Sequence, residues 1–200
     1  MALWVFGYGS LLWNPGFDVV ETQAVTLDGY VRSFCMTSIH YRGTLAKPGL
    51  VLALDQVDGA NCLGLAMRVC PGREESALND LRKRELISSA YVEKKLPIVL
   101  ENDIKEHAVA YVIDRKHRQY VGDITLEEQA QRISRAVGER GPNTEYLFKT
   151  VAHLRRIGLK DPKLDWLEQR VRQLTASDLG DKSSLCYSYE MDRPAIEPSQ

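Results

Sequence analysis

The distribution of apolar and polar residues divides the chain into a largely strand-like first part and a helix-like second part. Six runs of apolar and β-branched residues have the length and composition of strands: residues 5–8, 30–36, 50–54, 62–69, 91–100 and 107–113. Glycine, aspartate and asparagine separate these runs, notably at 28–29 and 58–61, where we expect turns. Connections this short favour antiparallel neighbours, so the pattern predicts a mostly antiparallel meander.

Apolar residues recur at helical spacing in four segments, one between the strands and three after residue 123. The first helix is expected at 74–86, because Pro71-Gly72 precedes it and Glu74 and Glu75 suit the positive end of a helix dipole. Each later helix has one apolar face: Leu126, Ala130, Ile133 and Val137; then Leu147, Val151 and Leu154; then Leu164, Leu167, Val171 and Leu174.

Capping signals define the expected starts of the three later helices. Thr125 and Glu128 have the spacing of a capping box. Asn143 or Thr144 is expected to cap the second of these helices, and Asp161-Pro162 to begin the third, because proline is favoured at the first helical position.

Together these elements predict one α+β domain over residues 1–176, with a β-rich core and helices packed around it. Residues 177–200 are polar, include proline and serine near the end, and show no sustained apolar period. We therefore expect them to form a C-terminal tail that is partly flexible.

Composition and charge exclude several classes of function. The net charge of -1 gives no electrostatic basis for binding nucleic acid or an anionic membrane surface. We find no signal peptide and no apolar run long enough to span a bilayer. The four cysteines lie far apart without a C-x-x-C pair, and the four histidines lack metal-ligand spacing. These features predict a cytoplasmic protein with reduced thiols and no bound metal.

The stretch at residues 5–13 carries the first candidate chemistry. An apolar run breaks at Gly7 and Gly9, which flank Tyr8, and Ser10 follows at once. Glycine within a strand marks a bend or a close backbone approach, and a tight loop with free N–H groups can hold a polar ligand. A plain first strand with a bend explains the same residues. Phosphate binding is disfavoured, because neither a third glycine nor the lysine of a P-loop follows.

The second candidate is Glu85, near the end of the helix expected at 74–86. Leu78 and Leu81 mark its apolar stripe, and Glu85 occupies the next position on that stripe. Burial and the negative end of the helix dipole would both raise the pKa of this carboxyl toward the range useful for proton transfer. A buried ion pair with Arg82, Arg84 or a distant arginine is the alternative explanation.

Four segments together resemble the ChaC family of γ-glutamylcyclotransferases, in the branch that acts on glutathione. They occur in the family's order and spread over residues 3–175: Val5-Phe6-Gly7-Tyr8-Gly9-Ser10-Leu11, His40-Tyr41-Arg42-Gly43 with Lys47-Pro48-Gly49, Arg84-Glu85, and Gly141-Pro142-Asn143-Thr144-Glu145-Tyr146-Leu147. The resemblance implies a γ-glutamylcyclotransferase-like fold, in which a small, mostly antiparallel β-barrel has flanking helices and a ligand pocket at its mouth.

The resemblance also implies roles for individual residues. Glu85 would be the catalytic acid and base. The substrate-binding stretch would be Val5, Phe6, Gly7, Tyr8, Gly9, Ser10 and Leu11, with Tyr8 to Leu11 as the cradle for the γ-glutamyl group. Arg42 would bind a substrate carboxylate or serve the structure of its loop, and Tyr111 and Tyr146 are candidates for pocket hydroxyls. One departure is that the turn at 86–91 lacks the glycine frequent in the family and contains Ser88-Ser89.

The reaction implied by the resemblance is intramolecular. The α-amine of the γ-glutamyl group attacks its own γ-carbonyl, which yields 5-oxoproline and, from glutathione, cysteinylglycine. No metal, nucleotide or other cofactor takes part, and Ser10 would orient the substrate without acting as a nucleophile. Two alternatives stay open: cyclisation of other γ-glutamyl amines or amino acids, and a non-enzymatic regulatory protein linked to cation transport. The oligomeric state is not readable from the sequence.

Overall fold

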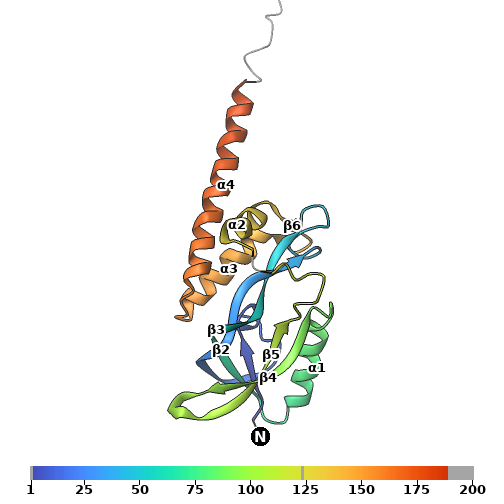
Figure 1. The fold of residues 1–200 in the computed structure, drawn as a ribbon, viewed down its shortest axis with the longest axis vertical. Helices are drawn as coiled ribbons and strands as arrows, with labels where there is room; N and C mark the ends of the chain where they lie inside the picture. Colours follow the sequence, from blue (N-terminus) through green and yellow to red (C-terminus); the bar gives the residue numbers. More distant parts are fainter. Residues whose placement is uncertain (1, 123, 189–200) are drawn as a thin grey trace, which may run out of the picture.

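The fold is an α+β arrangement built on a five-stranded mixed sheet in the order β2-β3-β1-β5-β4 (Figure 1). A computed structural model describes residues 2–122 and 124–188, with side chains described as far as residue 176. The strands of this sheet are β1 (Trp4–Gly7), β2 (Val19–Ser38), β3 (Gly49–Val69), β4 (Tyr91–Val99) and β5 (Lys105–Ile113). Short 3-10 helices, η1 (Ser10–Leu12) and η2 (Glu101–Asp103), follow β1 and β4.

Four α-helices flank the sheet: α1 (Glu74–Glu85), α2 (Leu126–Arg135), α3 (Asn143–Arg156) and α4 (Pro162–Ser188). A two-stranded hairpin, β6 (Val137–Gly138) with β7 (Gly141–Pro142), links α2 to α3. Figure 1 shows α4 projecting from the body of the molecule beyond α2 and α3. No helix in the described part of the chain is long and apolar enough to cross a membrane.

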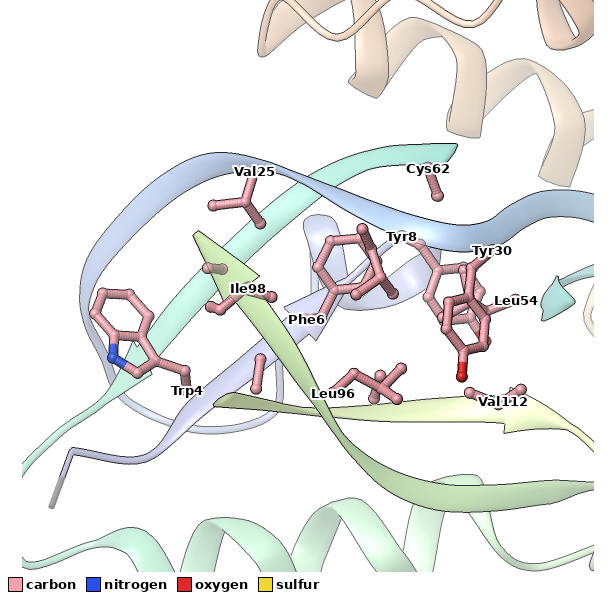
Figure 2. Close-up of a cluster of buried hydrophobic side chains, with 14 of the residues drawn as sticks. Trp4, Phe6, Tyr8, Val25, Tyr30, Leu54, Cys62, Leu96, Ile98 and Val112 are labelled. Carbon is pink, nitrogen blue, oxygen red and sulfur yellow. The ribbon is translucent and has the colours of Figure 1, made fainter. Parts of the chain in front are cut away.

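The main sheet curves around its own core (Figure 2), but the ladders among the described residues do not show the closed barrel that the resemblance implies. The pairs β2–β3, β1–β3 and β4–β5 are antiparallel, whereas β1–β5 and a short β3–β5 contact are parallel. No ladder among residues 2–122 and 124–188 joins β2 to β4, so these two strands form the edges of the sheet. Figure 2 shows side chains of all five strands, among them Phe6, Leu54 and Val112, pointing toward one another inside the curve.

The alternation of side chains along β1 and β5 places a core on each face of the sheet. Phe6 and Val112 point into the interior of the curve, while Val5 and Tyr111 point outward and pack with Leu81 of α1. A third core lies between β2, β3 and helices α2 to α4. The sheet thus holds α1 and the end of β1 against each other, which positions the residues of the site.

The turns expected at 28–29 and 58–61 are wrong, because β2 and β3 each run unbroken through these positions. Asp28 pairs with Asn61 and Tyr30 with Gln56, so the register shifts between them. Gly29 and Gly59 have φ values of 77° and 75°, respectively. Glycines in this conformation form bulges inside an antiparallel ribbon as readily as they form hairpin turns, and the chain reverses instead in the loop at 39–48.

Two expectations for the later helices are also wrong. Val137 does not extend the apolar face of α2, which ends at Arg135; Val137 lies in β6 and is exposed. Neither Asn143 nor Thr144 caps α3 with its side chain. The fully buried Asn143 instead accepts a hydrogen bond from the Leu50 N–H (2.7 Å) and donates one to the Leu50 carbonyl (2.8 Å).

The remaining helix signals are confirmed. The Thr125 hydroxyl accepts a hydrogen bond from the Glu128 N–H, and Asp161 caps α4 through the Leu164 N–H. The backbone of α4 continues past residue 176 to Ser188. The flexibility expected of the tail at 177–200 stays a prediction. The side chains after residue 176 and the backbone after residue 188 lie outside the described residues.

Candidate active site

A cavity of about 910 Å³ opens where the β1–η1 loop, the end of α1 and the loop at 39–42 converge. The start of α3 and the β6–β7 hairpin complete its wall. Most of the residues expected to form the site line it: Tyr8, Gly9, Ser10, Leu11, Arg42, Glu85, Tyr111 and Tyr146. A cavity of this size is within the range of sites for small molecules.

Three residues of the expected substrate-binding stretch lie elsewhere. Val5 and Phe6 are fully buried and point into cores on opposite faces of the sheet. Gly7 follows them in β1, where an added Cβ would lie 2.7 Å from the terminal methyl of Met67. None of the three belongs to the described wall of the cavity, so they serve the packing of β1.

Arg84 connects the two candidates that the sequence places 75 residues apart. Its guanidinium donates to the Ser10 hydroxyl at 2.8 Å and to the Asn14 carbonyl at 2.6 Å. The same group forms an ion pair with Glu85, with Nε 3.0 Å from Oε1. Arg84 therefore fixes the loop after β1 relative to the carboxylate at the end of α1.

Both explanations of the position of Glu85 on the apolar stripe apply: its pKa is raised, and it forms an ion pair with an arginine. Its side chain is 16% exposed, lines the cavity and pairs with Arg84. Burial raises the pKa of the Glu85 carboxyl, and the charge of Arg84 opposes that shift without cancelling it. The carboxyl is thus held in reach of the Gly9-Ser10 loop with a raised proton affinity.

The buried Tyr8 and the half-buried Tyr91 and Tyr146 line the same cavity as Glu85. Burial is the main cause that raises the pKa of Tyr8, Tyr91 and Tyr146, for Tyr146 to about 12, and the negative charge of Glu85 adds to each shift. These phenols therefore stay protonated at neutral pH and act as hydrogen-bond donors. Tyr8 donates to the carbonyl of Tyr111 at 2.9 Å, and Tyr91 to that of Leu52 at 3.0 Å.

Tyr111 lines the cavity, but its hydroxyl has a partner outside the reaction centre. The hydroxyl donates to Glu93 at 3.2 Å, and Arg82 holds that carboxylate with two hydrogen bonds. The part of Tyr111 that serves the site is its backbone carbonyl, which accepts the Tyr8 hydroxyl.

Arg42 lines the cavity from the loop at 39–48, where two glycines permit a close backbone crossing. An added Cβ on Gly43 would lie 2.1 Å from the Gly49 nitrogen, which no side chain tolerates. The Arg42 guanidinium donates to the Pro142 carbonyl at 3.1 Å and lies 5.6 Å from the centre of the Tyr146 ring. These contacts give Arg42 a structural role and leave it at the cavity wall.

Arg32 is a residue that the sequence reasoning missed. It is 5% exposed, donates to the Tyr8 carbonyl and the Leu63 carbonyl, and pairs with Asp161 at 3.0 Å. Arg32 therefore fixes the backbone at Tyr8, the first residue of the loop at 8–11. The spacing in the sequence held a signal for this burial. Tyr30, Arg32 and Phe34 occupy every second position of one strand, so Arg32 lies on the same buried face as the two aromatic residues.

Metal-binding groups are not apparent in the described part of the chain: no cluster of three or more histidine, cysteine, aspartate or glutamate side chains there could hold an ion. The free cysteines Cys35 and Cys62 are buried, and burial raises the pKa of both thiols.

Comparison with known proteins places these features in a family. The family of ChaC-like proteins matches residues 3–174. The chain is 34% identical over 179 residues to the glutathione-specific gamma-glutamylcyclotransferase of Escherichia coli (strain K12), covering 90% of this chain and 77% of that protein. It is 35% identical over 182 residues to gamma-glutamylcyclotransferase 2-3 of Arabidopsis thaliana, covering 87% and 90%.

A solved structure agrees with the fold. The crystal structure of the yeast gamma-glutamylcyclotransferase specific to glutathione superposes with a TM-score of 0.76, covering 88% of this chain and 100% of that chain at 21% identity. At this identity the superposition supports the fold alone. The match over residues 3–174 and the two relatives carry the assignment: the chain belongs to the family of ChaC-like proteins.

Proposed function

We propose that this protein is a γ-glutamylcyclotransferase that converts glutathione to 5-oxoproline and cysteinylglycine. The observation that carries the proposal is the position of Glu85, a largely buried carboxylate that faces the same cavity as the Gly9-Ser10 loop. This arrangement occurs in a ChaC-like chain whose relatives include enzymes named for this activity on glutathione.

The chemistry needs a folded substrate and a group that moves protons from the attacking nitrogen to the leaving nitrogen. The α-nitrogen of the γ-glutamyl group forms a bond to the γ-carbonyl carbon, and the bond from that carbon to the cysteine nitrogen breaks. The α-ammonium loses one proton before the attack, and the same nitrogen loses a second as the lactam forms. The leaving nitrogen gains both and departs as the ammonium group of cysteinylglycine, so the reaction consumes no water. Because nucleophile and electrophile belong to one molecule, holding the productive conformer contributes up to about 7–11 kcal/mol.

Glu85 is the group suited to move these protons. Its carboxylate accepts each proton that the α-nitrogen loses, and its carboxylic acid passes that proton to the leaving nitrogen. The raised pKa of Glu85 favours this exchange, since it brings the proton affinity of the carboxyl closer to neutral pH. Arg84 keeps the carboxylate beside the loop that holds the substrate.

The loop at residues 8–11 is proposed to bind the γ-glutamyl group. Backbone N–H groups near Gly9 and Ser10 are suited to an α-carboxylate or to the oxyanion that forms on the γ-carbonyl. Ser10 orients, because its hydroxyl accepts from Arg84 and no base contacts it in the described part of the site. Arg42 and Tyr146 are proposed to contact the substrate farther along the cavity wall.

We further propose that the catalytic unit spans residues 1–176 and acts in the cytoplasm. Support for the boundary comes from α4, where Val171 is buried and Leu174 still packs partly against the core. The relatives named for activity on glutathione support a small molecule as the partner.

The test compares glutathione with γ-glutamylalanine and γ-glutamyl-lysine as substrates of the purified protein, with 5-oxoproline as the product measured. A strong preference for glutathione is expected. Preference for another compound would move the assignment to a different γ-glutamyl substrate, and no turnover of any of them would support a non-enzymatic protein. Mass spectrometry of Ser10→Ala and wild type during turnover should find no covalent γ-glutamyl adduct.

A further inference from the structure

Three arginines line the cavity, Arg42, Arg84 and Arg140, and the mechanism does not use Arg140. Arg140 lies in the β6–β7 hairpin and lines the same cavity as Glu85 and Ser10, with its guanidinium against the ring of Tyr41. We infer that Arg140 is a specificity-determining residue that binds the terminal carboxylate of the leaving dipeptide. The inference rests on the proposed function, because it concerns the substrate of the same site.

The backbone around Arg140 is fixed even though its side chain is exposed. The Arg140 N–H donates to the Tyr41 carbonyl at 3.0 Å, and the Glu139 N–H donates to the His40 carbonyl at 2.9 Å. Between the hairpin and the loop at 39–48 there is no space for a side chain at Gly138, because an added Cβ would lie 2.4 Å from the His40 carbonyl oxygen. The hairpin and the loop at 39–48 therefore act as one rigid wall.

The guanidinium of Arg140 is held in place and still has donors to offer. Its central carbon lies over the Tyr41 ring, 4.0 Å from the ring centre, so the cation contacts an aromatic face. No hydrogen bond or ion pair of this guanidinium occurs within the described residues. Arg42 differs, since its guanidinium already contacts the Pro142 carbonyl and Glu145. A stacked arginine keeps its N–H edge free for a planar carboxylate.

The substrate carries a negative charge that matches the Arg140 guanidinium. The γ-glutamyl group is proposed to lie at the loop containing Gly9 and Ser10, and the cysteinylglycine part extends away from it by roughly 7 Å for two residues. The glycine carboxylate is then the charged group farthest from Glu85. Glu139, on the same hairpin, also lines the cavity, so its negative charge offsets part of the positive charge there.

The inference also gives a physical basis for substrate choice. A γ-glutamyl amine without a carboxylate at this distance leaves Arg140 without its partner, and γ-glutamylalanine places its carboxylate one residue too close to the reaction centre. Such compounds cyclise by the same chemistry but bind less well in the productive pose.

The experiment measures kcat/KM for glutathione and for glutathione whose glycine carboxylate is an amide. For wild type we expect about a tenfold preference for the free acid, as for a partly exposed charge-assisted hydrogen bond. Arg140→Ala should lose this preference through a higher KM for glutathione, with the rate on the amide unchanged. Arg140→Lys should recover only part of it, because the amine lacks the planar donor pair.

Arg135→Ala is the matched control, since it removes an arginine at the end of α2, outside the cavity. It should keep the full preference. The inference is overturned if Arg140→Ala still prefers the free acid tenfold, if Arg42→Ala alone removes the preference, or if wild type does not discriminate. Wild type that turns over neither compound would instead refute the proposed function, and with it the substrate on which this inference depends.

Discussion

Replacing Glu85 with glutamine is the perturbation that separates chemistry from structure most sharply. Glutamine keeps the size of the side chain and its capacity to accept a hydrogen bond from Arg84, but it does not accept the α-ammonium proton. The cavity, the loop at residues 8–11 and the substrate contacts stay in place. The variant therefore removes proton transfer and leaves substrate positioning.

The expected loss follows from that division. General acid–base catalysis contributes about 10²–10⁴-fold in rate, or about 3–5 kcal/mol at 1.36 kcal/mol per tenfold. Positioning, worth up to about 7–11 kcal/mol, remains. We expect kcat for 5-oxoproline formation to fall by about three orders of magnitude with KM changed less than about threefold. A kcat within fivefold of wild type would refute the role of Glu85.

Stability provides an independent check on the same variant. The folded pKa of Glu85 is raised, so the ionised carboxylate costs folding free energy that grows as pH rises from the ordinary glutamate value through the raised value. Glutamine lacks that charge, and the lost ion pair with Arg84 is partly exposed and worth little. Urea unfolding at neutral pH should show Glu85→Gln at least as stable as wild type. A loss above about 2 kcal/mol would identify Glu85 as a structural residue.

Three further substitutions test other parts of the account. Arg84→Met removes the charge that lowers the pKa of Glu85, so the acid limb of the kcat–pH profile should move to higher pH; an unchanged limb contradicts the coupling. Asn143→Ala strands the N–H and carbonyl of Leu50 in the core and should cost about 3 kcal/mol in urea unfolding, whereas a cost below about 1 kcal/mol would show that water replaces the amide. Ser89→Gly relieves a φ of 53° and should stabilise the protein by up to about 1 kcal/mol, because strain relief exceeds the added chain entropy; destabilisation would refute strain at this turn.

Local patterns predicted the parts of the fold that depend on neighbouring residues. The stripe formed by Leu78, Leu81 and Glu85 is a property of one helix, so its spacing sufficed to direct the carboxylate inward. The capping signals at Thr125 and Asp161 worked for the same reason, since cap and helix lie within four residues of each other.

Features that depend on contacts between distant segments could not be predicted from the sequence. Gly29 and Gly59 carry the same signal for a bulge as for a turn, and only the partner strand decides between them. Asn143 looks like a helix cap until Leu50, 93 residues away, offers a better pair of partners. The hydrogen bond from Arg84 to Ser10 joins residues 74 positions apart and has no periodic signal in the sequence. Only the resemblance to a family indicated that the two residues belong to one site.

The central claim is intramolecular cyclisation of glutathione, and one measurement tests it most directly. Purified protein is incubated with glutathione in water enriched in oxygen-18, and the products are identified by mass spectrometry. The account predicts 5-oxoproline and cysteinylglycine in equal amounts, with no oxygen-18 incorporated by the enzymatic reaction. Release of glutamate that carries one solvent oxygen, or no cleavage of glutathione, would contradict it.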